Sequence, residues 1–463
     1  MIRHEEHRGT PGTESPVRPR LHLTPDRGWV NDPLGLTYHH GTYHLFTQYV
    51  PGQTTWSPEC HWGHATSTDL LGWTHQPVVL SPGDGDGGAW SGSIATAPGD
   101  ATRLFYTSVQ PDDVRIGRVR VAHPDGDEWT SWTKGDVVAE LPAGVDAIAF
   151  RDPCVYHDGS RWRMLVGAGV ADGTAAALSY RSDDLVSWAY DGILASRHTS
   201  ETDPVWTGTV WECPQLFPMG DRWVLIVAVW EPWTPHYEAY AVGHLVDGRF
   251  VAGPWHRLTY GPSYYAPSTY VDQAGQRGLI HWLRDVKDPD GSWAGASSVP
   301  HVLTLHGDRV VAEPHPNITQ LRRHGVVVDP HRDPTPIPVT SDITWQPGTP
   351  PEASTAGEAT LHVTVTGEPV LTITRSRATL LVDTVDGTWE MPYEDGEVRV
   401  ILDNLVAEVF ARTGTIAVPL PHVTDPQLHV TGYGQAEAHA LARPAPLVQI
   451  DDPLQRPNME ARS

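Results

Sequence analysis

Short apolar segments rich in Val, Leu, Tyr and Trp recur along most of the chain, separated by clusters of Gly, Asp and Pro. Segments of this length, bounded by turn residues, are typical of β-strands. Long stretches with the 3.6-residue period of an amphipathic helix are scarce. The pattern therefore predicts an all-β protein. The clearest strand candidates are 42–50, 103–109, 161–170, 222–230 and 277–285.

A repeat underlies these segments. Residues 65–80 resemble residues 179–194, because both carry an Asp-Leu-x-x-Trp core followed by a short apolar strand. A period of about 50–60 residues built only of strands is typical of a β-propeller. Residues 21–321 would then hold five four-stranded blades; the alternative is two unrelated β-sandwiches with chance Trp spacing. The tryptophans that mark the repeat are Trp73, Trp132, Trp188 and Trp255, which lie 59, 56 and 67 residues apart.

The last third of the chain predicts a second domain. Residues 322–340 are rich in proline and charge and read as a linker. Strand-like alternation then resumes, which predicts a β-sandwich over 341–450. The ends, 1–20 and 451–463, are expected to be disordered tails. The strand candidates of the sandwich are 359–367, 378–385, 397–411 and 426–434.

Charge and cysteine content exclude several classes of function. The chain carries 32 basic and 56 acidic side chains, a net charge of −24, which repels nucleic acid and anionic membranes. Its three cysteines have no paired spacing, so neither a disulfide framework nor a metal site is indicated, and no cofactor is expected. The first twenty residues contain no apolar run of signal-peptide length, which predicts a cytoplasmic protein. The 19 tryptophans suit either sugar binding or a core.

Three acidic residues stand beside proline or cysteine in aromatic settings: Asp32 in WVNDP, Asp152 in FRDP and Glu212 in WECP. One such motif alone indicates a turn. These three lie 120 and 60 residues apart, in different proposed blades. Inner strands of a propeller converge on a central channel, so the three carboxyl groups can meet there. Clustered carboxyl groups are what glycoside hydrolysis requires.

With these motifs the chain resembles glycoside hydrolase family 32, the invertase and fructanase family, over nearly its whole length. The resemblance implies a five-bladed β-propeller followed by a C-terminal β-sandwich, in agreement with the repeat. The matching segments, in order, are WVNDPLG (29–35), YHLFTQYVP (43–51), WGHATSTDLLGW (62–73), WSGS (90–93), FRDP (150–153), WECPQLF (211–217) and ILDNLVAEVF (401–410).

The resemblance also implies the roles of the site residues. Asp32 would be the nucleophile that forms a covalent fructosyl-enzyme, Glu212 the acid and then the base, and Asp152 a stabiliser of the transition state. The implied activity is a retaining β-fructofuranosidase that releases fructose from sucrose or short β-fructosides. The residues that would bind the sugar are Asn31, Gln48, Trp56, Trp90, Ser91, Arg151 and Trp282.

Other interpretations of the sequence stay open. A fructosyltransferase of the same architecture would pass the fructosyl group to a second sugar instead of water. A sugar-binding homologue without activity is a further alternative, although such proteins typically lose one of the three acids. An arabinan- or xylan-cleaving propeller is disfavoured by the pairing of WVNDP with WECP. Sucrose, sucrose 6-phosphate and short fructans all remain candidate substrates, and the oligomeric state is open.

Overall fold

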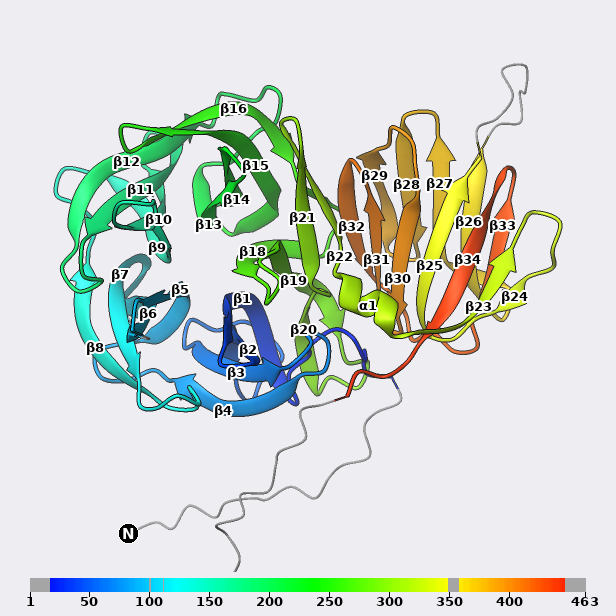
Figure 1. Ribbon diagram of the computed structural model, residues 1–463, viewed down its shortest axis with the longest axis horizontal. Helices are drawn as coiled ribbons and strands as arrows, with labels where there is room; N and C mark the ends of the chain where they lie inside the picture. The colour runs from blue at the N-terminus through cyan, green and yellow to red at the C-terminus, as the bar shows by residue number, and fades with distance from the viewer. Residues whose placement is uncertain (1–16, 100, 111, 349–357, 446–463) are drawn as a thin grey trace, which may run out of the picture.

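A computed structural model describes residues 17–99, 101–110, 112–348 and 358–445, and in them the all-β prediction is confirmed. Strands β1 to β22, except β17, surround a centre, and strands β23 to β34 form a second body at the side of this ring (Figure 1). The described residues contain one short helix, α1 (Pro316–Gln320), between the two bodies. No helix among them has the length and apolar character needed to cross a membrane.

Strands β1 to β16 pair in four consecutive antiparallel sets of four, numbered from the centre outward (Figure 1). The first set is β1 (Gly28–His39), β2 (Thr42–Val50), β3 (His61–Ser67) and β4 (Thr74–Leu80). The second is β5 (Gly88–Ala97), β6 (Ala101–Gln110), β7 (Asp113–Pro124) and β8 (Trp132–Ala139). The third is β9 (Ala147–His157), β10 (Trp162–Val170), β11 (Thr174–Ser182) and β12 (Ala189–His198).

The ring then returns to its first strand. The next set is β13 (Val210–Met219), β14 (Arg222–Glu231), β15 (Thr234–Val246) and β16 (Arg249–Arg257). The last strands are β18 (Tyr264–Val271), β19 (Arg277–Lys287), β20 (Trp293–Ser297), β21 (His301–His306) and β22 (Arg309–Pro314). β20 pairs both with β19 and, in parallel, with β1. The beginning and the end of the ring are therefore held together by backbone hydrogen bonds.

The tryptophan repeat has a structural counterpart. Trp73 and Trp188 directly precede β4 and β12, Trp132 begins β8, and Trp255 lies near the end of β16. These are the outermost strands of their sets, so the repeat visible in the sequence follows the rim of the ring. All five leading strand candidates are also strands of the ring.

The second body consists of two sheets that enclose one apolar core. The larger sheet has the order β17-β32-β31-β30-β25-β34-β23, and the smaller one β24-β33-β26-β27-β28-β29. Their bounds are β17 (Thr259–Tyr260), β23 (Arg322–Val328), β24 (Thr335–Pro336), β25 (Thr340–Pro347), β26 (Ala359–Val365), β27 (Glu368–Ser376), β28 (Thr379–Thr384), β29 (Gly387–Pro392), β30 (Val398–Asp403), β31 (Val406–Ala411), β32 (Gly414–Pro419), β33 (Gln427–Thr431) and β34 (Gly434–Leu441).

The linker predicted over 322–340 is corrected by this topology. β23 and β24 are edge strands of the two sheets, and β23 pairs with β34. Proline and charged residues suit an edge strand, because one of its sides needs no hydrogen-bond partner. Of the predicted tails, 1–16 and 451–463 lie outside the described residues, whereas Arg20 donates its backbone N–H to Asp403 of the second body.

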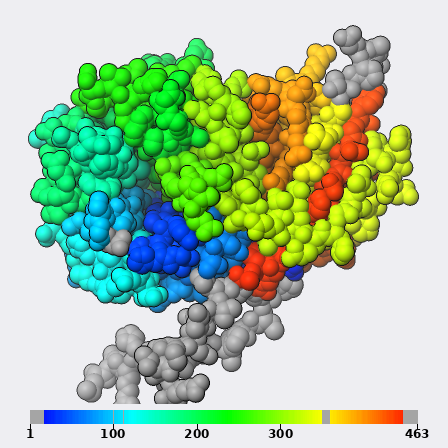
Figure 2. All heavy atoms as spheres, viewed as in Figure 1, coloured from blue at the N-terminus to red at the C-terminus, as the bar shows by residue number. Residues whose placement is uncertain are grey.

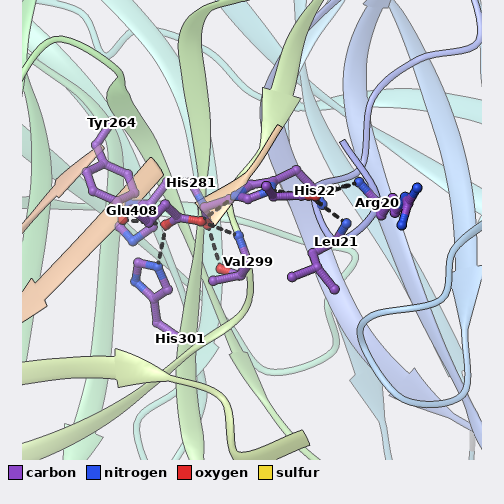
Figure 3. A network of polar contacts seen from close by, with 10 residues as sticks. Arg20, Leu21, His22, Tyr264, His281, Val299, His301 and Glu408 are labelled. Carbon is purple, nitrogen blue, oxygen red and sulfur yellow. Dashed lines mark hydrogen bonds and ion pairs between the residues drawn. The ribbon is translucent and has the colours of Figure 1, made fainter. Parts of the chain in front are cut away.

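The two bodies are in direct contact (Figure 2), and a buried polar network joins them (Figure 3). Glu408 of β31 accepts hydrogen bonds from Val299 N at 2.8 Å and from the Tyr264 hydroxyl. His22 contacts Glu408 through Nε2 at 2.7 Å and Asp403 through Nδ1 at 2.8 Å. The N-terminal segment, the ring and the second body therefore share one set of buried ionisable groups.

Candidate active site

The innermost strand of each set is interrupted by a β-bulge where its register with the next strand slips. A bulge leaves its extra residue out of the ladder and redirects the neighbouring side chains. Three of the bulges contain a non-glycine residue with positive φ: Asp152 (63°), Cys213 (45°) and Ala266 (52°). The slips lie at 30–33 in β1, 90–92 in β5, 151–154 in β9, 212–215 in β13 and 265–268 in β18.

The bulges explain how residues far apart in sequence reach one place. A cavity of about 630 Å³ is lined by residues from the bulges of all five inner strands. From the β5 bulge, Trp90 lines the cavity and Ser91 does not. Nine of the ten predicted site residues line this cavity: Asn31, Asp32, Gln48, Trp56, Trp90, Arg151, Asp152, Glu212 and Trp282. The tenth, Ser91, hydrogen-bonds to Asp32.

Asp32 is buried and held by three side-chain donors. Asn31 Nδ2 donates to its Oδ1 at 3.0 Å, and Gln48 Nε2 donates to its Oδ2 at 3.0 Å. The Ser91 hydroxyl also donates to Oδ2. An ionised carboxylate has only acceptors, so these three donors fix its orientation. The arrangement suits an anionic group that must point in one fixed direction.

Asp152 faces Asp32 across Cys213. The backbone N–H of Cys213 donates to Asp152 Oδ2 at 3.0 Å, and the thiol sulfur lies 3.5 Å from Asp32 Oδ2. This N–H points at Asp152 because the bulge takes it out of the strand ladder. Burial, together with the nearby charge of Glu212, raises the pKa of Asp152 to about 7, while Arg151 opposes the rise.

Glu212 is held by one contact at each oxygen. The Tyr265 hydroxyl donates to Oε2 at 2.7 Å, and Arg151 Nε forms an ion pair with Oε1 at 3.3 Å. Burial raises the pKa of Glu212; Arg151 and Tyr265 lower it, and the charge of Asp32 raises it further. The balance favours a carboxyl group that keeps its proton to higher pH than an exposed glutamate. Such a group can act as a general acid.

Aromatic rings form much of the cavity wall. Trp56 packs edge-on against Trp90 with ring centres 5.6 Å apart, and Trp282 packs in the same way against Trp29 at 5.5 Å. Within the described structure, Trp282 Nε1 and Gln48 Oε1 are buried and have no protein hydrogen-bond partner. Buried polar atoms are nearly always satisfied, so both are suited to bind hydroxyl groups of a ligand.

Sequence reasoning did not single out Tyr265, although a signal for it exists. Four inner strands carry a pair of residues followed by proline: Asn-Asp-Pro, Arg-Asp-Pro, Glu-Cys-Pro and Tyr-Ala-Pro, at 31–33, 151–153, 212–214 and 265–267. Aligned on the proline, Tyr265 corresponds to Glu212, and Cys213 corresponds to Asp32 and Asp152. Trp230 and Trp233, which also line the cavity, stand in no such motif.

The described residues contain no cluster of three or more His, Cys, Asp or Glu side chains arranged to hold a metal ion. The three cysteines are buried and unpaired.

Comparisons with known proteins identify relatives of the whole fold and of its sequence. Residues 22–314 match the model of the glycosyl hydrolases family 32 N-terminal domain. Sucrose-6-phosphate hydrolase of Bacillus subtilis (strain 168) is 32% identical over 327 residues, 67% of either chain. Raffinose invertase of Escherichia coli is 30% identical over 339 residues, 68% of either chain. The structure of a β-fructofuranosidase of Bombyx mori superposes with a TM-score of 0.79 at 24% identity, covering 93% of this chain and 95% of that chain.

Proposed function

The chain belongs to glycosyl hydrolase family 32 and is an invertase-like glycoside hydrolase; from this premise we propose that it releases fructose from sucrose or a short β-fructoside with retention of configuration. The observation that carries the proposal is that Asp32, Asp152 and Glu212, from β1, β9 and β13, line one cavity. Two carboxyl groups on the reacting bond, one ionised and one protonated, are the minimum that glycoside hydrolysis needs.

In the first step Asp32 attacks the anomeric carbon of the fructosyl unit while the bond to the leaving-group oxygen breaks. Glu212 donates its proton to that oxygen, so the departing sugar leaves as a neutral alcohol. The product on the enzyme is a fructosyl ester of Asp32. The donors on Asp32 keep it pointed at the anomeric carbon, and the raised pKa of Glu212 keeps its proton available.

In the second step Glu212, now ionised, removes a proton from a water molecule that attacks the same carbon. The ester bond breaks, Asp32 leaves as a carboxylate, and Glu212 has its proton again. Two inversions at one carbon give net retention. Arg151 and Tyr265 stabilise the ionised form of Glu212 that exists between the two steps.

Asp152 and the neighbouring polar groups hold the fructosyl unit in this scheme. Asp152 accepts hydrogen bonds from fructose hydroxyl groups, and Asn31, Gln48 and Trp282 contribute further polar contacts. This assignment is supported by the unpartnered Gln48 Oε1 and Trp282 Nε1 in the cavity wall. We also infer that the four four-stranded sets, together with the group β18 to β22, are the blades of a five-bladed propeller over 21–321, followed by a sandwich that begins at β23.

Stereochemistry tests the proposal directly. Proton NMR during the first minutes of sucrose cleavage should show β-fructofuranose before its α anomer; α-fructofuranose as the first product would mean inversion. With the Glu212→Gln variant and an activated aryl β-fructoside, the peptide that contains Asp32 should gain the mass of one fructosyl unit. Product analysis at high sucrose concentration distinguishes hydrolysis from transfer to a second sugar.

A further inference from the structure

Trp233 is an unusually exposed aromatic residue at the mouth of the cavity. Its exposed fraction is 76%, and it lines the same cavity as Glu212. It sits in the two-residue turn between β14 and β15, where Glu231 pairs with Thr234. An exposed tryptophan on a cavity rim is a surface that can contact a ligand.

The backbone of Trp233 adds a second observation. Its φ is 69°, in the left-handed region, and Pro232 precedes it in the turn. A turn with proline first and positive φ second favours glycine or asparagine at the second position. A bulky residue held there costs free energy, which points to a function for its side chain.

A chain of contacts leads from the proposed acid to this rim. Glu212 Oε1 is paired with Arg151, whose guanidinium carbon lies 4.9 Å from the ring centre of Trp230. The Trp230 ring in turn lies 6.4 Å, edge-on, from the ring of Trp233. Glu212 protonates the leaving group in the proposed mechanism. Trp233 therefore lies on the side of the cavity where the leaving-group sugar departs.

The basic side chains at the cavity already have protein partners. Among the described residues that line the cavity, the basic side chains are Arg115 and Arg151. Arg115 forms a fork with Asp113, at 3.1 and 3.2 Å, and Arg151 pairs with Glu212. Arg284 does not line the cavity; its guanidinium carbon lies 5.0 Å from the ring centre of Tyr265, and it donates to the carbonyl oxygens of Pro235 and His236.

A phosphate group would therefore enter an unfavourable environment. It would meet three carboxyl groups, while the largely buried Arg151 is paired with Glu212 and the exposed Arg115 has the carboxylate of Asp113 beside it. Tight phosphate recognition needs charge-assisted donors that are free to bind it. This side of the cavity instead presents apolar faces, which suit the C–H faces of an uncharged sugar ring. They belong to Trp230, Pro232, Trp233 and Pro235.

We propose, on the basis of the proposed fructoside hydrolysis, that this rim is the leaving-group subsite for an uncharged sugar and that Trp233 is its stacking platform. The substrate class is sucrose and short neutral fructosides, and sucrose 6-phosphate is a poor substrate. In this respect the chain differs from the relatives named as sucrose-6-phosphate hydrolases.

The first test compares substrates with the unaltered protein. kcat/KM for fructose release from sucrose and 1-kestose should exceed that from sucrose 6-phosphate by about tenfold or more. A higher value with sucrose 6-phosphate would overturn this inference and leave the proposed function intact. Failure to release fructose from all three would remove the proposed function, and this inference with it.

The second test isolates Trp233. In Trp233→Ala, kcat/KM for sucrose and 1-kestose should fall about tenfold, mainly through KM, and Trp233→Phe should recover most of the loss because it keeps a flat ring. The inhibition constant of free fructose should stay unchanged in both variants, because fructose occupies only the inner pocket. Val251→Ala, which removes an exposed apolar group outside the cavity, is the matched control. Unchanged kinetics in Trp233→Ala would refute the role of Trp233 as a stacking platform. So would a weakening of fructose inhibition as large as the loss of kcat/KM.

Discussion

The hydroxyl group of Tyr265 donates a 2.7 Å hydrogen bond to Oε2 of Glu212, and the two residues occupy corresponding bulges of β18 and β13. This contact lowers the pKa of Glu212, against the larger effect of burial, which raises it. The pKa of Glu212 therefore depends on the side chains around it as well as on its burial. The fold holds these groups together before any substrate binds.

Replacing Tyr265 by phenylalanine tests this relationship. The proposed acid works only while protonated, so the Glu212 ionisation leaves kcat/KM at its maximum below the pKa of Glu212 and reduces it above that pKa. Loss of the hydroxyl removes a contact that lowers this pKa, so the alkaline limb of the pH profile should move to higher pH. We expect kcat/KM at the optimum to fall about tenfold. Tyr237→Phe, which removes a hydroxyl bonded to the Trp206 carbonyl, is the control; equal pH profiles for Tyr265→Phe and the unaltered protein would contradict the assignment.

Substitution of Asp32 by asparagine should remove the nucleophile with little change in shape. Fructose release should fall by a factor of about 10⁴ or more, while the thermal unfolding curve keeps its midpoint within a few degrees. Asp184→Asn changes an aspartate that caps the turn between β11 and β12, away from the cavity, and should leave kcat unchanged. Substantial activity in Asp32→Asn would eliminate Asp32 as the attacking group.

The buried carboxylate of Glu408 predicts a large effect on stability. In Glu408→Gln, the charged His22 loses one of its two carboxylate partners, and the amide N–H₂ meets other donors. Breaking a buried ion pair on one side costs about 3–5 kcal/mol, which a urea unfolding curve would show. Glu397→Gln, at the exposed end of the same sheet, should cost less than about 0.5 kcal/mol. A similar cost for the two variants would mean that the network contributes little.

The same network gives stability a pH dependence. Burial alone would lower the pKa of His22, but its hydrogen bonds to Asp403 and Glu408 raise it from 6.5 to about 9. The stabilisation is therefore complete below pH 6.5 and is lost as the pH rises through about 9. The free energy of unfolding should fall by about 3 kcal/mol over this range, and His22→Gln should flatten the dependence. Equal slopes in both proteins would place the titrating group elsewhere.

The cysteines should be unreactive in the folded protein. Burial raises the pKa of Cys154 to about 11 and raises those of Cys60 and Cys213 above their usual range; for Cys213 the charges of Asp32 and Asp152 add to the effect. Thiolates are the reactive form, so a thiol reagent at pH 8 should modify none of the three before unfolding and all three in denaturant. Fast labelling of Cys213 in the native protein would show that solvent and reagent reach its thiol, and would contradict its burial.

The sequence by itself determined the strand content, the rim repeat and the acidic motifs. Apolar segments bounded by turn residues specify strands locally, and the tryptophans of the outer strands recur because each set repeats the same packing. Asp32, Asp152 and Glu212 were visible because each stands in a short motif with proline. These signals can be recognised in the sequence without knowledge of which strands pair.

Tertiary structure alone decided which side chains meet. Tyr265 reaches Glu212 only because the inner strands bulge at matching points around a ring, and sheet register is not encoded within one strand. The contact of His22 with Glu408 joins residues 386 positions apart, so no local pattern announces it. Residues 322–328 became an edge strand because a partner strand, β34, lies beside them. Such contacts form only when distant segments of the ring and of the second body pack together, and this packing depends on the whole chain.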